Sequence, residues 1–342
     1  MKQGWERKKI KDICDKATSN IAQNKIVGID GDFPVYGASG FVQNVNFYHR
    51  DSAYIGVVKD GAGVGRVNIY PAYSSLLGTL QYILPKEGYL MEYVAYALKG
   101  LNLASHASGA TIPHIYFKNY GEIDIPIPPL SIQERIVEEL DCISGIIEKK
   151  KEQLKELDAL AQSIFYTMFG DPVGNDKGWE TCPVIEVVKM QRGFDLPVQH
   201  RDGKGDIPIY GSNGVIGYHS EYKAKTGIIT GRSGTLGEVY VSNEPYWPLN
   251  TTLFSVDTHG NNIIYLKYLM KYFHLERFKA GAGVPTLNRN EFHNKPIPLI
   301  PLPLQQEFAK KIEAIEKQKE LIKASIGEVE TLLASRMQEY FE

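Results

Sequence analysis

The second half of the chain repeats the first, and this duplication limits the possible folds more than any other feature of the sequence. "GWERKKIKDIC" begins at Gly4 and its copy "GWETCPVIEVV" at Gly178, while "FPVYGASG" begins at Phe33 and its copy "IPIYGSNG" at Ile207, so both pairs have the same offset. Farther along, "VKDGAGVGRV" (58–67) pairs with "TGRSGTLGEV" (230–239), and the offset has shortened by only two positions. So small a drift over half of the chain indicates a tandem duplication of one folding unit.

Each copy predicts the same order of elements. Its first part contains short apolar runs, such as "AYIGVV" and "TTLFSV", separated by Gly, Pro, Asn and Asp, which is typical of a β-rich globular domain. "YLMEYVAYALKGL" and "IIYLKYLMKYF" have helical spacing at corresponding places. The second part of each copy predicts one long helix. The expected fold class is therefore α/β (α+β), with two tandem-repeat globular domains and two long helices.

An isoleucine-proline run precedes each predicted long helix, as "IPIPPLSIQERIVEEL" at Ile125 and "IPLIPLPLQQEFAKKI" at Ile297. Proline favours an extended backbone before it, so each run predicts an edge strand or a polyproline segment. Ser131 followed by Glu134 has the spacing of a capping box, which predicts a helix start there. Pro303 and Gln306 stand at the corresponding positions, so the second helix is expected to be capped differently.

Both predicted helices carry a heptad seam with 4-3-4-3 spacing. Runs of about 38 residues correspond to rods of roughly 55 Å. An exposed rod with such a seam needs a partner, and a pseudo-twofold chain would pack its two rods antiparallel. They could be a plain spacer, or a ruler that fixes the distance between two recognition domains. The seam comprises Ile136, Leu140, Ile143, Ile147, Lys150, Leu154, Leu157, Ala161, Ile164 and Met168 in the first helix and Phe308, Ile312, Ile315, Lys319, Ile322, Ile326, Val329, Leu333, Arg336 and Tyr340 in the second.

Composition argues against several classes of protein. The chain lacks an apolar run of about 18 residues, and its charged N-terminus lacks the apolar core of a signal peptide, so we expect a cytoplasmic protein without a membrane segment. Cys14, Cys142 and Cys182 form no CxxC pair, which argues against a disulfide framework or a metal site. The formal charge is −2, but the two predicted helices contain 16 acidic and 11 basic residues, so the globular parts are net positive.

Catalytic motifs are missing. "NEPYW" at Asn243 differs from the Asn-Pro-Pro-Tyr signature of amino-methyltransferases, because Glu244 replaces the first proline. "GAGVGR" (61–66) lacks the third-glycine spacing of a dinucleotide loop, and neither it nor "GRSGTLG" (231–237) has the lysine of a phosphate-binding loop. We expect a chain that catalyses nothing and binds no cofactor by itself.

The residues resemble the specificity (S) subunits of type I restriction-modification systems over essentially the whole chain. The two proline-rich joins carry part of the resemblance. The rest lies in "GFDLPVQHRDGKGDIPIYGSNGVIGYH", "GIITGRSGTLGEVYVS", "YWPLNTTLFSV" and "GAGVPTLNRNEF", which are similar to segments of the family's target-recognition domains. The resemblance implies two such domains, at 1–130 and 171–302, and two conserved helices, at 131–170 and 303–342.

The same resemblance implies a function and partners. Each domain would read one half of an asymmetric bipartite double-stranded DNA site. Methyltransferase (M) subunits, expected as two copies, would dock on the helices, and restriction (R) subunits would join them. S-adenosylmethionine, ATP and Mg²⁺ are expected only in these partners. The alternatives are a specificity subunit whose nuclease is fused to the methyltransferase, an autonomous adenine methyltransferase, and a coiled-coil regulatory or structural protein without DNA specificity.

Glycine-rich and polar loops supply the candidate DNA contacts. Glycine allows the backbone to approach a phosphate closely, arginine pairs with guanine or phosphate, and asparagine pairs with adenine. The alternatives are plain hairpin glycines, an Asn-Gly turn and structural histidines. The copies are expected to differ where Lys59 and Asp60 face Gly231 and Arg232, and where His114 faces Thr286. The candidates are Tyr36, Ser39, Lys59, Arg66, His106, Ser108, Thr111 and His114 in the first copy and Tyr210, Ser212, Asn213, Arg232, Ser233, Thr235, Lys279, Thr286 and Arg289 in the second.

Overall fold

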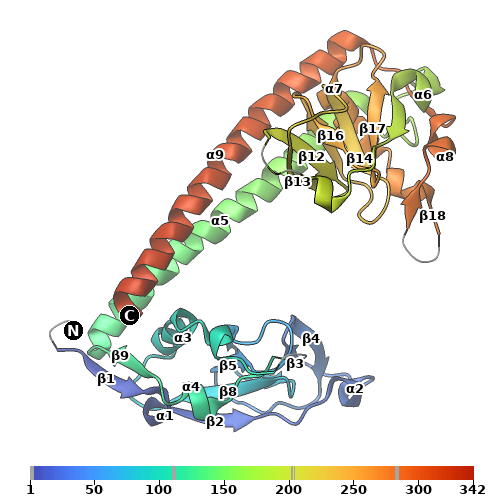
Figure 1. The fold of residues 1–342 in the computed structure, drawn as a ribbon. Helices are drawn as coiled ribbons and strands as arrows, with labels where there is room; N and C mark the ends of the chain where they lie inside the picture. The colour runs from blue at the N-terminus through green and yellow to red at the C-terminus, as the bar shows by residue number, and fades with distance from the viewer. Residues whose placement is uncertain (1–3, 110–112, 202, 204, 282–284) are drawn as a thin grey trace. The chain divides into compact units, whose positions relative to one another are not determined.

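Two compact units make up the structure, a computed structural model that describes residues 4–109, 113–201, 203, 205–281 and 285–342 (Figure 1). Unit 1 comprises Met1–Lys151 and Ala324–Glu342, and unit 2 comprises Glu152–Lys323. Each unit therefore contains one globular part and a stretch of each of two long helices. The finer division into recognition domains and spacer helices stays a prediction.

Unit 1 is built on a four-stranded antiparallel sheet in the order β2-β8-β5-β6. A three-stranded sheet, β4-β3-β7, and a two-stranded sheet, β1-β9, complete it. Helix α3 packs against β5, β6 and β8. The strands are β1 (Glu6–Lys9), β2 (Cys14–Thr18), β3 (Phe33–Gly37), β4 (Gly40–Val45), β5 (Tyr54–Val58), β6 (Val67–Tyr70), β7 (Ser75–Leu76), β8 (Leu80–Pro85) and β9 (Asp124–Ile127), and the short helices are α1 (Ile10–Ile13), α2 (Gln23–Ile26), α3 (Met91–Gly100), η1 (Leu103–His106) and α4 (Phe117–Tyr120).

Unit 2 repeats this plan. Its sheets have the orders β11-β17-β14-β15, β13-β12-β16 and β10-β20, and a small pair, β18-β19, is added. Helix α7 packs against β14 and β15. The strands are β10 (Thr181–Pro183), β11 (Lys189–Arg192), β12 (Ile207–Gly211), β13 (Gly214–His219), β14 (Gly227–Gly231), β15 (Val239–Ser242), β16 (Trp247–Pro248), β17 (Thr252–Asp257), β18 (Lys279–Ala280), β19 (Thr286–Leu287) and β20 (Pro296–Pro298), and the short helices are α6 (Val184–Val187), η2 (Val198–His200), α7 (Ile263–Tyr272), η3 (Leu275–Phe278) and α8 (Arg289–His293).

The central strands explain why both units form stable cores. Every residue of β5 and of β14 is buried, because each strand is covered on both faces. Continuous apolar runs such as "YIGVV" suit this position, whereas a half-exposed strand alternates apolar and polar residues. The isoleucine-proline runs form β9 and β20, which are edge strands paired antiparallel with β1 and β10. Proline is tolerated there because an edge strand leaves one row of backbone donors unpaired.

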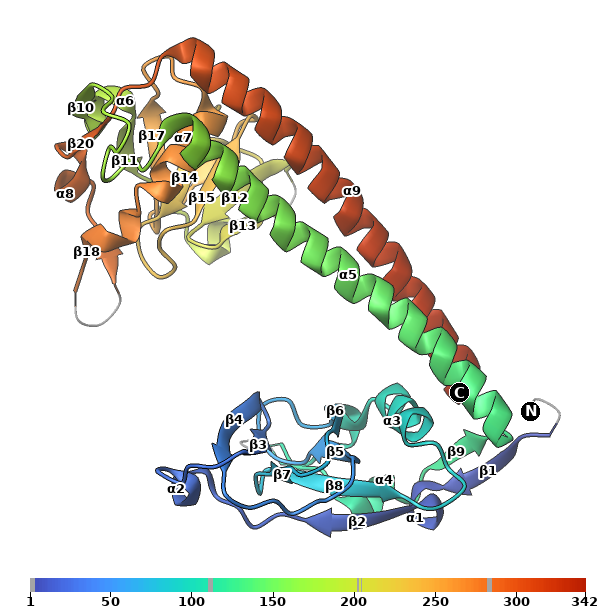
Figure 2. The same cartoon turned by 180° about the vertical axis from the view of Figure 1, so that it is seen from behind.

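The two predicted long helices are α5 (Leu130–Phe169) and α9 (Leu302–Phe341). In unit 1, Tyr340 near the end of α9 donates a hydrogen bond of 2.6 Å to Glu139 near the start of α5. In unit 2, Lys319 of α9 donates one of 2.7 Å to Asp158 of α5. The helices therefore lie side by side and antiparallel, as both views show (Figures 1 and 2).

The seam residues face the interior of this helix pair. Every apolar residue of the seam is buried or half-buried, whereas Leu160 and Leu321, outside the seam, are 47% and 65% exposed. The polar interruptions have partners: Lys319 contacts Asp158, and the Arg336 guanidinium lies 2.9 Å from Glu139. Phe165 lies outside the 4-3-4-3 seam and is nevertheless fully buried, because the end of α5 also packs into the core of unit 2.

The two helix starts are built alike, contrary to the expectation from Pro303 and Gln306. Each helix begins one residue before the expected position, so Ser131 lies inside the first turn of α5 rather than at its cap. A glutamine of that first turn holds each start in place instead.

These glutamines are Gln133 and Gln305, and both are 1% exposed. Gln133 donates to the carbonyl of Pro128 at 2.9 Å and accepts from the N–H of Leu90 at 3.0 Å. Gln305 donates to the carbonyl of Ile300 at 2.8 Å and accepts from the N–H of Asn262 at 2.9 Å. Each glutamine therefore ties an extended run to the start of α3 or α7, which corrects the capping-box prediction.

Candidate nucleic-acid interface

The two units place a basic residue at the same point of the backbone, directly after the central strand. The N–H of Lys59 donates to the carbonyl of Thr79 at 3.0 Å, and the N–H of Arg232 donates to the carbonyl of Thr251 at 2.8 Å. Thr79 and Thr251 occupy equivalent positions in the sequence repeat. Arg232 is therefore the structural counterpart of Lys59.

A second pair of hydrogen bonds gives the same correspondence. The carbonyl of Lys59 accepts from the N–H of Ile115 at 2.9 Å, and the carbonyl of Arg232 accepts from that of Leu287 at 2.7 Å. The expectation that Lys59 faces Gly231 is therefore wrong by one residue. Strand pairing explains the shift. Leu80 and Thr252 are equivalent in the repeat, and they pair with Val58 at the end of β5 and Gly231 at the end of β14. Val58 therefore corresponds to Gly231, and the next residue, Lys59, corresponds to Arg232.

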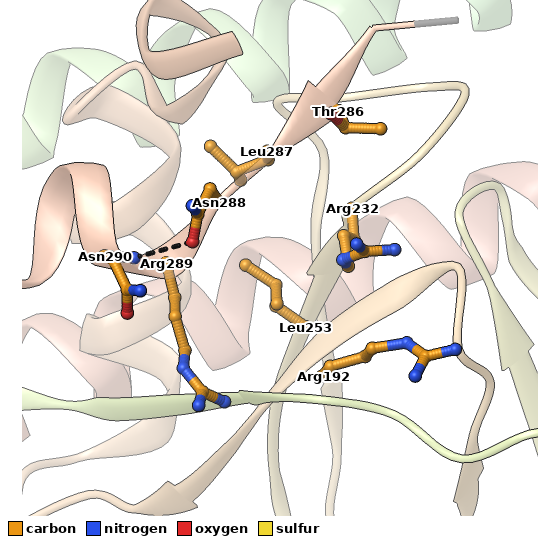
Figure 3. A pocket seen from close by; sticks show the side chains of 8 residues that line it. All are labelled: Arg192, Arg232, Leu253, Thr286, Leu287, Asn288, Arg289 and Asn290. Carbon is orange, nitrogen blue, oxygen red and sulfur yellow. Dashed lines mark hydrogen bonds between the residues drawn. The ribbon is translucent and has the colours of Figure 1, made fainter. Parts of the chain in front are cut away.

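In unit 2, three arginines line one pocket of about 340 Å³ (Figure 3). Arg192 ends β11, Arg232 follows β14, and Arg289 begins α8. Strands β11 and β14 flank β17, so these ends meet around Leu253 of β17. The remaining lining residues are Thr286, Leu287, Asn288 and Asn290.

Short local contacts hold α8 in position beside the pocket. The side chain of Asn288 caps α8 by accepting a hydrogen bond of 3.1 Å from the N–H of Asn290. The N–H of Met190 in β11 donates to Nε2 of the buried His293 at 3.2 Å. Burial, together with nearby Arg289 and Lys189, holds the pKa of His293 below its usual value. His293 is therefore a neutral acceptor that anchors α8 to β11.

The pocket has a strongly positive character. Its lining contains no carboxylate, and among the described residues neither Arg232 nor Arg289 forms an ion pair. Arg192 reaches Asp195 at 3.3 Å, but both side chains are at least half exposed. Guanidinium groups that line one pocket repel one another, and an anion or an electron-rich edge bound there relieves the repulsion. A DNA phosphate, or O6 and N7 of guanine, meets this requirement.

Unit 1 has different side chains at the positions that correspond to the arginine-lined pocket of unit 2. Asp60 accepts a hydrogen bond from Nδ1 of His114, and Nζ of Lys59 lies 3.9 Å from the same carboxylate. By the offsets of the repeat, Thr18 and Phe117 stand where unit 2 has Arg192 and Arg289. Unit 1 therefore keeps one basic residue of the pocket and replaces two arginines with neutral side chains.

The other candidates of unit 1 are distributed over several loops. Ser39 is exposed and lines a separate pocket of about 730 Å³ with Asn20, Gln23 and Thr79. The carbonyl of Thr79 accepts from the N–H of Lys59. Tyr36 is half-buried against Tyr70. His106 is exposed at the end of η1, Ser108 pairs by its backbone with His114, and Thr111 lies outside the described residues.

Arg66 is exposed, but its guanidinium folds back onto its own loop. It donates to the carbonyls of Gly63 at 3.2 Å and Ala62 at 3.1 Å. Gly63 has a φ of +91°, a backbone conformation that residues with a Cβ rarely adopt. This loop therefore needs glycine at 63, and Arg66 stabilises it rather than standing free at the surface.

The other candidates of unit 2 differ in exposure. Tyr210 is only 8% exposed and packs on Tyr246, so it supports the core beneath the loop instead of facing solvent. Ser233 pairs by its backbone with Thr286 beside the pocket. The exposed candidates are Asn213 and Thr235 in loops and Lys279 on β18, whereas Ser212 is half-buried.

Sequence patterns missed several residues of these pockets. Arg192, Asn288 and Asn290 were not among the candidates, nor were Asn20 and Gln23. Arg192 ends a strand directly before Gly193. A long polar side chain at a strand end before glycine was the available signal. In the described ranges we find no cluster of three or more potential metal ligands, and no helix there is long and apolar enough to cross a membrane.

Comparison with known proteins adds a family match. The model of the family described as "Type I restriction modification DNA specificity domain" matches residues 2–158 and, a second time, residues 176–331. A relative is the MjaIX type I restriction enzyme specificity subunit of Methanocaldococcus jannaschii, with 24% identity over 89% of this chain and 85% of the relative. Another is the EcoDI specificity subunit of Escherichia coli, with 20% identity over 90% of this chain and 79% of the relative.

Solved structures share the fold. The S subunit of a type I restriction-modification system from M. genitalium aligns with a TM-score of 0.64 and 15% identity, covering 99% of this chain and 96% of that one. A chain from a study of complex assembly in a type I system aligns with a TM-score of 0.58 and 16% identity, covering 99% and 97%. At this identity the likeness concerns the fold.

Proposed function

Because the chain belongs to the type I restriction-modification DNA specificity family, we propose that it reads an asymmetric bipartite double-stranded DNA site, one half with each unit. The duplicated units provide two similar reading surfaces in one chain. The match of the family domain to both copies supports one reading surface for each half-site.

One observation carries the proposal. Both units hold a cation at the same backbone point, Lys59 in unit 1 and Arg232 in unit 2, while the side chains around it differ. A shared cation suits a contact that every DNA half-site offers, namely a phosphate or a common base edge. Different neighbours suit different base sequences, so the two half-sites differ.

The long helices supply the second part of the proposal. Methyltransferase subunits, two in number, dock on α5 and α9, and restriction subunits join that complex. The exposed apolar residues Ile146, Leu160 and Leu332 on these helices support a docking role. The helix pair also acts as the ruler that sets the gap between the half-sites.

The chain itself performs no chemistry in this proposal. The partners bind S-adenosylmethionine, ATP and Mg²⁺, and the complex works in the cytoplasm. The pockets of both units are lined by groups that suit recognition, and neither lining contains a paired acid and base for proton transfer.

Mapping methylated adenines tests the function. The chain is expressed with its genomic neighbours, and the methylated positions are located by single-molecule sequencing. A split motif with two distinct halves is the expected result. A contiguous motif, or none, would refute the proposal. Methyl transfer by the isolated chain would instead identify an autonomous methyltransferase.

A further inference from the structure

The shared frame around Lys59 and Arg232 allows the two reading surfaces to be compared residue by residue. The residue after each cation also donates its N–H to the same threonine carbonyl: Asp60 to Thr79 at 3.3 Å, and Ser233 to Thr251 at 3.2 Å. Asp60 also forms a β-bridge with His114, and Ser233 forms one with Thr286. Asp60 and Ser233 are therefore equivalent, and so are His114 and Thr286.

These equivalent pairs have different chemistry. In unit 1 a carboxylate holds an imidazole. In unit 2 the same backbone positions carry two hydroxyls, and the Thr286 hydroxyl donates to the carbonyl of Ala280 at 3.3 Å. The frame is constant while the groups that it presents change, which is the arrangement expected of positions that select between DNA sequences.

The imidazole of His114 is held in a fixed orientation. Asp60 binds its Nδ1, the ring of Tyr116 lies with its centroid 4.1 Å away, and the backbone of His114 pairs with that of Ser108 in both directions at 2.9 Å. A carboxylate on Nδ1 keeps the proton on that nitrogen and leaves Nε2 for another partner. The His114 side chain is 26% exposed, so a binding partner can contact it at the surface of unit 1.

We propose that His114 reads one base of the half-site of unit 1 through Nε2, and that Asp60 positions it. This inference rests on the proposed function. The ligand is the edge of a base in the major groove: Nε2 accepts from an exocyclic amino group of adenine or cytosine. Unit 2 presents Ser233 and Thr286 at the equivalent place and therefore selects a different base.

The test gives unit 1 the two residues that unit 2 has at the equivalent positions. The double variant Asp60→Ser/His114→Thr is assembled with its partner subunits, and its methylation motif is mapped beside that of the wild type. We expect discrimination at one base position of the unit 1 half to fall by about tenfold or more. The unit 2 half should stay unchanged and serves as the internal control for assembly and folding.

Two matched variants separate reading from structure. His114→Asn keeps a donor near the place of Nδ1 for Asp60 but removes Nε2, so it should relax the same base position. Asp60→Asn keeps an acceptor for Nδ1, so it should retain the motif, whereas Asp60→Ala should relax it. A pair that only stabilises the loop would instead tolerate His114→Asn, because that variant keeps the bond to Asp60 and loses only Nε2.

Each outcome decides the question. An unchanged unit 1 half in both Asp60→Ser/His114→Thr and His114→Asn would overturn this inference and leave the proposed function intact. If the double variant does not assemble, His114→Asn decides alone. Absence of a split motif in the wild-type complex would refute the proposed function, and this inference with it.

Discussion

Lys59 and Arg232 hold the same backbone position although the sequence aligns them one residue apart. A long cationic side chain at the end of a central strand is well placed for a partner that approaches the sheet edge. The strand fixes the Cα of the residue, while the charged group of the side chain extends outward. In unit 2, Arg192 and Arg289 add to this charge. Unit 2 therefore has the more positive of the two surfaces.

Removing Arg232 should weaken DNA binding. Arg232→Ala is expected to cost about 1–3 kcal/mol, roughly fivefold to 150-fold in affinity, because a guanidinium contact to guanine or phosphate is lost. Binding of a labelled duplex by the assembled complex, measured at several salt concentrations, checks this. Lys225→Ala, at an exposed position of unit 2 outside the pocket lining, is the matched control. Equal effects of both substitutions would contradict a specific role for Arg232.

Gln133 and Gln305 should be sites of strong destabilisation. Gln133→Leu keeps the volume but leaves the carbonyl of Pro128 and the N–H of Leu90 without their partner, so we expect a loss of about 2 kcal/mol or more. Urea unfolding measures the effect, and Gln305→Leu should behave alike. Gln306→Ala, at an exposed neighbouring position, should change little. A neutral Gln133→Leu would show that the helix start does not depend on this side chain.

The long helices combine an apolar seam with a few paired polar residues. In unit 2, Lys319 contacts Asp158 and Glu316, and Tyr268 donates to Glu316 at 3.1 Å. Burial by itself would raise the pKa of Glu316, but Lys267 and Lys319, with hydrogen bonds from Lys319 and Tyr268, hold it below its usual value. Paired polar groups at a seam favour one register over its alternatives.

Acid should weaken this part of unit 2 through Glu316. A carboxyl whose pKa is lowered by folding contributes stability above its unfolded pKa of 4.5, and that contribution is lost as the pH falls through the lower folded pKa. Glu316→Gln should therefore lower the melting temperature at pH 7 and reduce its decline on acidification. Melting curves from pH 7 to acid conditions test this, with Glu313→Gln at an exposed position as control. If the melting temperatures of the wild type and of Glu316→Gln decline in parallel on acidification, Glu316 is excluded as the cause.

The duplication reaches the last turn of each long helix. Phe169 ends α5 in the core of unit 2, and Phe341 ends α9 in the core of unit 1, where they are 3% and 4% exposed. The ring centroids of Phe169 and Tyr265 are 5.2 Å apart, and those of Phe341 and Tyr93 are 5.3 Å apart. Each long helix thus starts in one unit and ends in the other.

Because of this exchange, a substitution at a helix end should act on the unit that receives it. Phe341→Ala is expected to destabilise unit 1 by about 3 kcal/mol or more, and Phe169→Ala should do the same in unit 2, since each leaves a cavity. Hydrogen exchange resolved by peptide locates the loss of protection. Leu321→Ala, at a 65% exposed position, is the control. Equal loss of protection in both units after Phe341→Ala would contradict this assignment.

Much of the architecture was predictable from the sequence. The repeat, the β-rich parts and the seam follow from periodicity, since a helical period marks a helix face and short apolar runs mark buried strands. The helix starts were less accessible. A capping box is a local pattern, whereas Gln133 and Gln305 act through distant backbone groups of Leu90 and Asn262.

The sequence by itself determined the duplication, the paired antiparallel helices and the loops that could contact DNA, because these follow from spacing along the chain. Only the tertiary structure decided which of those side chains meet. It matched Lys59 with Arg232, gathered Arg192, Arg232 and Arg289 around one pocket, and buried Tyr210. The physical reason is strand pairing. Hydrogen bonds between distant segments fix the register, and a shift of one residue changes which side chain stands at a strand end.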